Sequence, residues 1–265
     1  MSRGIIIHAQ NTTDVNYVEC AEILAQSIVK YMPNIHLSII TNNIKRSKYF
    51  DKVISLPHGD LDVEGKSKLV NDWQVYQASP YVETLKLEAD LYITRSFDFW
   101  WDVLKHKDIV VSTTIRNFKQ EISTSRYYRK FLDDNNLPDV YNAITYFKKS
   151  NLAEQFFMIV KDVFEYWDRY KSVLKCNMHE ECSTDWAYAI ACHIIGVENT
   201  TLPTFDAMSM VHMKQHINNL QVNDWQEVLV YELSQDFLRL NSYPQLYPFH
   251  YHIKKFSKKL VKVYE

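Results

Sequence analysis

Short β-branched runs alternate with a helical pattern in the first part of the chain, and this alternation restricts the possible folds most strongly. The apolar runs 4–8 and 36–41 are too short for helices, so we expect them to be buried strands. Between them, apolar residues recur at helical spacing from about residue 14 until Pro33. A third short run covers 52–56. Strand, helix and strand in this order predict an α/β fold with a parallel central sheet and right-handed crossovers.

Small or polar residues follow several of these runs at their carboxyl ends. In open α/β sheets, ligands bind beyond the carboxyl ends of the strands. We therefore expect a binding site at this edge of the sheet. The residues concerned are Ala9, Gln10, Asn11, Thr41, Asn42, Glu88, Ala89 and Asp90.

Two carboxylates of that group, Glu88 and Asp90, stand one residue apart in a strand-like run that begins near Tyr81. Side chains at positions i and i+2 of a strand point to the same face, so both can bind one hard cation. Carboxylate oxygens suit Mg²⁺ or Mn²⁺, and such an ion in turn neutralises a diphosphate. The alternative interpretation is an acidic pair at a solvated strand end.

The pattern continues with further elements. The run around Asp185 is typical of the first turn of a helix, where an acidic residue can simply be a partner of the helix dipole. We expect helices over about 66–77, 152–174 and 183–195, and strands over 108–115 and 140–147.

Positive charge gathers in two segments. Residues 116–138 combine aromatic rings with basic side chains, which fits a lid or an acceptor-binding excursion, and residues 248–265 carry lysines at helical spacing. A lysine stripe is either a solvated face or a phosphate-binding surface. Ahead of the stripe, His212 and Lys214 can bring an imidazole to a metal and an ammonium to a phosphate. The basic residues are Arg116, Lys119, Arg126, Arg129, Lys254, Lys255 and Lys258.

Composition excludes several classes of protein. The 265 residues have a net charge of −2, so any contact with nucleic acid must come from local patches. The four glycines form neither a G-x-G-x-x-G motif nor a P-loop. Four irregularly spaced cysteines, no signal peptide and no long apolar run predict a cytoplasmic protein without membrane contact. A zinc site at Cys176, His179 and Cys182 is a remote alternative, because the spacing does not match common zinc motifs.

Five stretches occur in the order expected of GT-A glycosyltransferases. On these residues the chain resembles the glycogenin-like retaining branch, and in particular the compact glycosyltransferases of T-even-like bacteriophages. The resemblance extends to about Tyr251. The stretches are 5–11 (IIIHAQN), 87–91 (LEADL), 140–147 (VYNAITYF), 184–186 (TDW) and 211–214 (VHMK).

This resemblance implies a nucleotide-diphosphate sugar donor, expected to be a UDP-sugar, and Mn²⁺ or Mg²⁺ as cofactor. Carried onto this chain, the metal would be held by Glu88, Asp90 and His212, and Lys214 would face the diphosphate. Asn142 and Asp185 would lie by the sugar and the acceptor, with Asp185 steadying the oxocarbenium-like sugar. The donor would be bound by Ala9, Gln10, Asn11, Tyr17, Lys68, Asn71, Glu88 and Ala89.

The chain departs from the family pattern at two points. Glu88 stands where the family usually has Asp, which we expect to alter donor choice more than metal binding. The glycine-containing H-x-x-G-x-x-K pattern is missing around His212, which leaves the role of Lys214 open.

The predicted function is therefore metal-dependent transfer of a hexose, or of a pentose such as arabinose, to an acceptor hydroxyl. The phage resemblance implies 5-hydroxymethylcytosine in double-stranded DNA as acceptor, contacted by the basic residues named above, and a location in the host cytoplasm. The alternatives are a glycan or protein acceptor, or a degenerate GT-A module that binds without turnover. We expect one GT-A domain over 1–247, with a nucleotide-sugar half (1–115) and an acceptor half (116–247), and a basic tail over 248–265.

Overall fold

A six-stranded sheet forms the centre of the protein in the computed structural model, which describes residues 2–43, 47–62, 68–177, 180–203 and 206–264. Four of its strands, which are neighbours in the sheet, are parallel to one another. The predicted α/β fold with a mostly parallel central sheet is therefore confirmed. In spatial order the strands are β3 (Lys52–Ile54), β2 (His36–Ile40), β1 (Arg3–His8), β4 (Glu83–Glu88), β8 (Tyr141–Lys148) and β6 (Ile109–Ser112).

The fifth strand in this order, β8, is the exception, because it runs antiparallel to both β4 and β6. The chain leaves β6 at the same edge of the sheet at which β4 ends. It then makes an excursion over 113–140 and returns from that edge, so the returning strand must run in the opposite direction. The excursion contains β7 (Ile115–Arg116) and α4 (Lys130–Asp134). The expected strand over 108–115 is accordingly split between two sheets.

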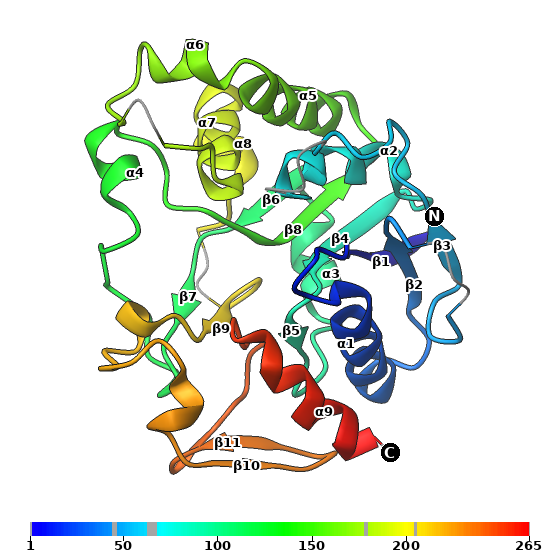
Figure 1. The fold of residues 1–265 in the computed structure, drawn as a ribbon. Helices are drawn as coiled ribbons and strands as arrows, with labels where there is room; N and C mark the ends of the chain where they lie inside the picture. The colour runs from blue at the N-terminus through cyan, green and yellow to red at the C-terminus, as the bar shows by residue number, and fades with distance from the viewer. Residues whose placement is uncertain (1, 44–46, 63–67, 178–179, 204–205, 265) are drawn as a thin grey trace.

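Each face of the central sheet is covered by its own hydrophobic core. Ile5 and Ile7 of β1 belong to one core and Ile6 to the other, as expected when successive side chains alternate between faces. Helices α5 (Asn151–Glu165) and α7 (Thr184–Ile195) lie on one side of the sheet, and α1 (Tyr17–Tyr31) lies on the other (Figure 1). With η1 (Lys68–Gln74), α2 (Val75–Ala78) and α3 (Trp100–Leu104), they complete the two layers.

Local sequence explains where these helices begin and end. The side chains of Asn16 and Ser183 accept hydrogen bonds from the first turns of α1 and α7. The expected helix over 152–174 is interrupted at Tyr166, where the backbone leaves helical geometry before α6 (Trp167–Lys171). The helix expected over 66–77 begins with the 3₁₀ turn η1, and residues 66–67 lie outside the described residues.

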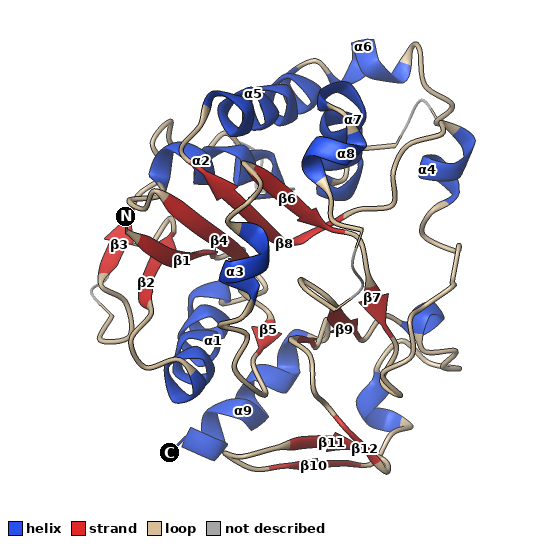
Figure 2. Ribbon diagram, turned by 180° about the vertical axis from the view of Figure 1, so that it is seen from behind, coloured by secondary structure: helices blue, strands red, loops and turns tan. Residues whose placement is uncertain are grey.

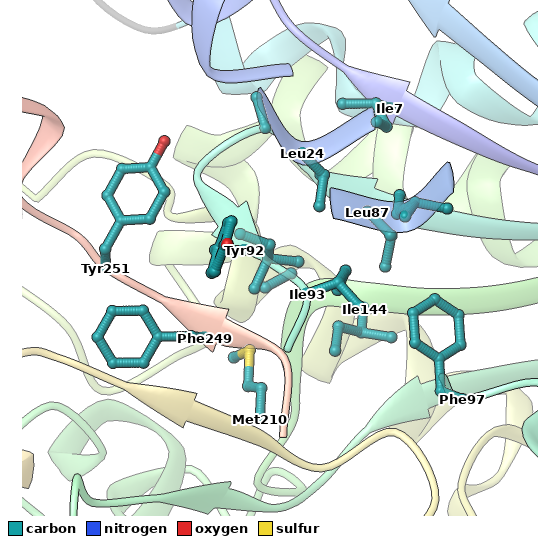
Figure 3. Packing of buried hydrophobic residues seen from close by; sticks show 14 of the residues in the cluster. Ile7, Leu24, Leu87, Tyr92, Ile93, Phe97, Ile144, Met210, Phe249 and Tyr251 are labelled. Carbon is teal, nitrogen blue, oxygen red and sulfur yellow. The ribbon is translucent and has the colours of Figure 1, made fainter. Parts of the chain in front are cut away.

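A second sheet lies beyond the carboxyl edge of the first (Figure 2). Its order is β5 (Leu91–Tyr92), β13 (Phe249–His250), β9 (Met210–His212) and β7, so a strand of the segment 248–265 lies in its interior. Figure 3 shows Phe249 and Tyr251 packed in one cluster with Leu24 and Leu87. The remaining elements are η2 (Gln215–Ile217), η3 (Trp225–Glu227), β10 (Tyr231–Leu233), β11 (Leu238–Leu240), β12 (Tyr243–Pro244), α8 (Val197–Thr200), η4 (Lys254–Phe256) and α9 (Ser257–Tyr264).

The described helices include none that is long and apolar enough to cross a membrane. All four cysteines are free thiols. The zinc alternative cannot be placed as a whole, because His179 lies outside the described residues.

Candidate metal and donor site

A cleft of about 360 Å³ opens at the carboxyl edge of β1 and β4, where the strand order predicts a site. It is bordered by the turn after β4 and by the segment after β13. Its lining residues include His8, Gln10, Thr12, Tyr17, Lys68, Leu69, Asp72, Glu88, Ala89, Asp90, Lys214, His250, His252 and Lys254.

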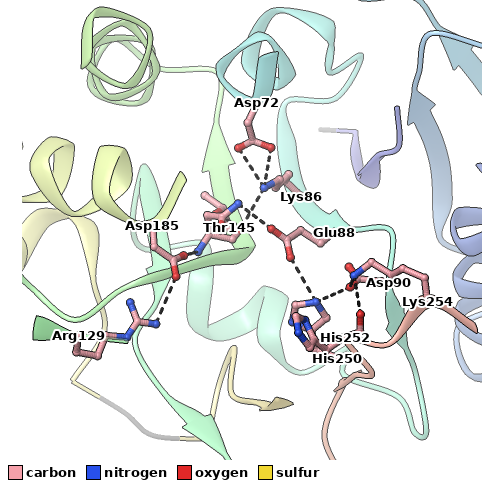
Figure 4. A network of polar contacts seen from close by, with 11 residues as sticks. Asp72, Lys86, Glu88, Asp90, Arg129, Thr145, Asp185, His250, His252 and Lys254 are labelled. Atoms are coloured by element: carbon pink, nitrogen blue, oxygen red, sulfur yellow. Dashed lines mark hydrogen bonds and ion pairs between the residues drawn. The ribbon is translucent and has the colours of Figure 1, made fainter. Parts of the chain in front are cut away.

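Glu88 is the last residue of β4 and points toward the cleft (Figure 4). The side-chain amide of Asn142 donates a 2.9 Å hydrogen bond to Glu88 Oε1, and His250 Nε2 lies 3.7 Å from Glu88 Oε2. Burial raises the pKa of Glu88, although the positive charges of His250 and Lys86 oppose that shift.

Asp90 lies in the turn that follows β4, so the pair does not share one strand as expected. The turn is fixed by the next pairing, because β5 runs beside β13 and the backbone N–H of Tyr251 donates to Asp90 O. His250 Nε2 donates a 2.7 Å hydrogen bond to Asp90 Oδ2, and the Lys254 ammonium donates to the same oxygen. Burial alone would raise the pKa of Asp90, but the charges of His250 and Lys254 outweigh it and hold the pKa well below its ordinary value.

Glu88, Asp90 and His250 form a group with the composition of a metal site. One ligand atom from each lies within 4.8 Å of the others, and within the described ranges this is the one group of three or more such residues. Two carboxylates suit Mg²⁺ or Mn²⁺, and the imidazole adds a nitrogen ligand typical of transition metals. The donor set therefore fits a divalent cation, and Mn²⁺ better than Mg²⁺.

His212, the histidine predicted to bind the metal, lies behind His250 and outside this group. The two residues are partners in the β9–β13 ladder, and their rings stack with centroids 4.4 Å apart and planes 7° apart. Burial, followed by the charge of His250, lowers the pKa of His212 well below its ordinary value. Nδ1 of each ring has no hydrogen-bond partner among the described residues. His250 thus lines the cleft, whereas His212 contacts the ring of His250 and does not line the cleft.

The sequence contains a pattern that indicates His250, although this residue falls in the segment expected to be a basic tail. His250, His252 and Lys254 repeat at two-residue spacing, like His212 and Lys214. All three line the cleft. The missed residues could have been found by treating 248–254 as a strand followed by a turn, as the structure shows.

A buried charge network adjoins Glu88 (Figure 4). Lys86 Nζ, on β4, lies 2.9 Å from Asp72 Oδ1 and donates a 3.0 Å hydrogen bond to Asn142 O. Asp72 also accepts hydrogen bonds from His8 Nδ1 and the Tyr188 hydroxyl. Burial opposes ionisation of Asp72, but the charge of Lys86 and the His8 hydrogen bond lower its pKa well below the ordinary value. The network fixes the backbone of Asn142, whose amide holds Glu88.

Asp185 and Asn142, predicted to lie by the sugar, are in contact with each other. The backbone N–H of Asn142 donates a 3.0 Å hydrogen bond to Asp185 Oδ1, and Arg129 lies 3.4 Å from Asp185 Oδ2. Asp185 is in the first turn of α7, so the dipole interpretation also holds. Through Asn142, the carboxylate of Asp185 is connected to that of Glu88.

The predicted donor-binding residues separate into two groups. Gln10, Tyr17, Lys68, Glu88 and Ala89 line the cleft, as does the predicted catalytic Lys214. Ala9, Asn11 and Asn71 are not part of the lining. Ala9 is buried.

Asn11 and Asn71 instead hold neighbouring loops. Asn11 Oδ1 accepts a hydrogen bond from Val18 N, and Asn71 Oδ1 accepts one from Leu61 N. Lys68, although in the lining, is already paired with Asp60 at 2.6 Å.

Most of the cations predicted to bind DNA phosphates have carboxylate partners. Arg126 pairs with Asp133 and Asp139. Arg129 is buried and lies 3.7 Å from the ring centroid of Tyr141, beside Asp139 and Asp185.

The other predicted cations differ in their surroundings. Arg116 contacts Asp206, Lys255 pairs with Asp224, and Lys254 points into the cleft. Lys119 and Lys258 are exposed. Five of the seven predicted cations thus have a carboxylate partner.

No family model and no curated protein matches the chain. Among solved structures, the galactosyltransferase LgtC in complex with donor and acceptor sugar analogs matches with a TM-score of 0.47 and 13% identity, over 71% of this chain and 70% of that one. The glycosyltransferase GlyE of Streptococcus pneumoniae TIGR4 matches with a TM-score of 0.44 and 10% identity, over 76% and 46%. The bifunctional WbbM matches with a TM-score of 0.43 and 15% identity, over 76% and 39%. The chain thus spans less than half of GlyE and of WbbM.

Proposed function

We propose that this protein is a metal-dependent glycosyltransferase of the GT-A type, which moves a sugar from a nucleoside-diphosphate sugar to an acceptor hydroxyl. One observation carries the proposal: Glu88, Asp90 and His250 converge in a cleft at the carboxyl edge of the parallel strands. Two of the three lysines that line this cleft, Lys214 and Lys254, would complete a site for a diphosphate.

The residues of the cleft divide the chemistry between them. Glu88, Asp90 and His250 would hold the cation, which stabilises negative charge on the departing diphosphate. Lys254 and Lys214 supply fixed positive charge for the same oxygens. Tyr17 and Gln10 also line the cleft, and we assign them to the nucleoside part of the donor, with uridine as the expected nucleoside.

Asp185 lies on the opposite side of Glu88 from Lys254 (Figure 4), and Asn142 contacts both Asp185 and Glu88. We assign Asp185 to electrostatic stabilisation of the oxocarbenium-like sugar and Asn142 to holding Glu88 in place. In a retaining reaction of the front-face kind, the leaving oxygen itself can assist deprotonation of the acceptor, so a dedicated base is not required.

The acceptor is a hydroxyl group, for which the sequence resemblance offers 5-hydroxymethylcytosine in DNA. Glycan and protein hydroxyls are the alternative acceptors. The ion pairs of Arg126 and Arg129 favour these alternatives, because a guanidinium already neutralised by carboxylates contributes little to phosphate binding. Binding without turnover is the remaining alternative function.

Release of nucleoside diphosphate tests the proposal. The protein is incubated with Mn²⁺ and a panel of nucleotide sugars that includes hexoses and pentoses, with hydroxymethylated DNA or neutral glycans as acceptors. We expect metal-dependent release, and a loss of about 100-fold or more in Asp90→Ala, because that variant loses a ligand and a charged contact.

Asp98→Ala, which removes an exposed carboxylate outside the cleft, is the matched control and should retain wild-type turnover. Full activity of Asp90→Ala, or no release with any donor, would contradict the proposal. Binding of a donor without release would identify a module instead of an enzyme.

A further inference from the structure

A groove distinct from the donor cleft lies between α4, the start of α7 and the segment before it. Its volume is about 730 Å³, within the range of ligand-binding pockets. Rings form much of its wall: Tyr127, Tyr128, Phe131 and Trp186. None of these residues belongs to the metal and donor site described above.

The groove leads toward the donor cleft through shared side chains. Tyr128 lines both the groove and a small cavity that also contains Arg129, Tyr141 and Lys214, and Lys214 in turn lines the donor cleft. The Lys214 ammonium lies 4.8 Å from the centroid of the Tyr128 ring. At the other wall, Trp186 directly follows Asp185. Tyr128 and Lys214 therefore connect the lining of the groove to the lining of the donor cleft.

Two of the aromatic rings are stacked on neighbouring rings. The Tyr127 ring stacks on His216 with centroids 3.6 Å apart, and the Trp186 ring stacks on Phe131 at 4.0 Å. Tyr127 nonetheless remains 65% exposed. A ring packed on one face and exposed elsewhere can receive the flat C–H face of a sugar at little cost in side-chain entropy.

The charges of the groove exclude a polyanion as occupant. Its charged lining residues are two lysines, Lys130 and Lys175, and two acids, Asp134 and Glu180, and Lys130 is paired with Asp134. Nucleic-acid sites need an excess of positive charge to release counterions from phosphates. A balanced mixture of donors and acceptors beside rings suits a ligand that is neutral and rich in hydroxyl groups.

We infer that this groove binds a neutral carbohydrate chain and presents one of its hydroxyls to the donor cleft. The role of this carbohydrate as an acceptor rests on the proposed function. The binding of carbohydrate by the groove is a separate property. It selects the glycan over DNA among the acceptors considered above.

Binding of neutral oligosaccharides tests the inference directly. An array of neutral glycans is probed with the wild-type protein, and the dissociation constant of the strongest ligand is then measured by calorimetry. Tyr127→Ala should weaken that binding by about tenfold, the loss expected when one stacked ring is removed. Tyr127→Phe, which keeps the ring, should stay within about twofold of wild type on the same reasoning.

Tyr166→Ala removes another exposed tyrosine, which does not line the groove, and should bind like wild type. The inference is overturned if no neutral glycan binds, if Tyr127→Ala binds as tightly as wild type, or if Tyr127→Ala loses affinity for a hydroxymethylated duplex instead. Turnover of nucleotide sugar by wild type is measured separately. If turnover is absent while Tyr127→Ala loses glycan binding, the transferase proposal fails and the carbohydrate groove stands.

Discussion

At the scale of single residues, Asp90 is the point where the positive groups of the cleft meet. Its carboxylate accepts hydrogen bonds from both His250 and Lys254, so an ammonium already shares one of its oxygens. A divalent ion must therefore compete with an ammonium for the same oxygen. This competition links metal binding to the position of Lys254, and so links the cation to the part of the cleft that would receive the diphosphate.

His252 makes stability depend on pH. Burial, followed by the charges of His250 and Lys254, lowers the pKa of His252 to about 4. Below the ordinary histidine pKa of about 6.5 the unfolded chain takes up a proton that the folded chain refuses, so stability falls as the pH drops toward 4. His252 also has a positive φ of 59°, a conformation that asparagine tolerates.

We expect His252→Asn to lose less stability than wild type between pH 6.5 and pH 4, by about 2 kcal/mol. Urea unfolding in EDTA measures this difference. His106→Asn, at an exposed histidine after α3, should keep the wild-type pH dependence. An unchanged pH dependence in His252→Asn would contradict the cause given for its pKa.

The candidate site could be predicted from sequence only where the strand pattern carries the information. Glu88 was predictable because β4 leads directly to it, and Asp90 because it lies two residues further. His250 was not, because its approach to Asp90 depends on the pairing of β13 between β5 and β9, strands more than 30 residues away along the chain. Two-residue strands carry almost no periodic signal.

At the scale of elements, β4 combines two environments in one strand. Lys86 is completely buried and paired with Asp72, while Glu88, two residues later, reaches the cleft. A buried ion pair is weak evidence for net stability, but removal of one partner leaves an uncompensated charge. The strand that positions the candidate metal ligands is thereby tied to η1 and α7 through Asp72 and Tyr188.

Lys86→Met should lower the free energy of unfolding by about 3–5 kcal/mol, because Asp72 stays buried without its cation. The double variant Lys86→Met with Asp72→Asn should be less destabilised than the single variant, as the buried charge is gone. Lys52→Met, at an exposed lysine of β3, is the control with little expected effect. Urea unfolding curves measure the free energy of unfolding of each variant. A value for Lys86→Met within about 1 kcal/mol of wild type, roughly the size of a surface effect, would contradict the role of the pair.

The elements also show which parts of the fold follow from local pattern. β1 and β2 were predictable because each is an apolar run too short for a helix, and α1 was predictable from the helical spacing of its apolar residues. The direction of β8 was not, because an antiparallel strand that is buried on both faces reads like a parallel one. The break at Tyr166 also lacks a proline or glycine to announce it.

At the scale of the whole molecule, cation binding is expected to stabilise the fold. Glu88 is the last residue of β4 in the central sheet and Asp90 lies in the turn after it, whereas His250 belongs to β13 of the second sheet. A cation held by all three joins the two sheets and is absent from the unfolded chain. At about 100 times its dissociation constant, such a ligand adds about 2.7 kcal/mol to the free energy of unfolding.

Addition of Mn²⁺ should therefore raise the Tm of the wild-type protein by roughly 5 °C or more, measured by calorimetry after removal of bound metal with EDTA. His250→Asn should lose this shift. His212→Asn should keep most of it, because His212 stands behind His250 and not in the ligand group. The reverse result would restore the sequence-based assignment of the metal to His212.

The insertion of β13 between β5 and β9 has a consequence for biosynthesis. The ribosome adds Glu88 and Asp90 about 160 residues before it adds His250 and Lys254. A chain interrupted before residue 249 can pair all six strands of the central sheet and still lack these two groups. Folding of the central sheet and assembly of the candidate cation site are thus separated in time, and a chain interrupted before residue 249 would be folded in part yet lack that site.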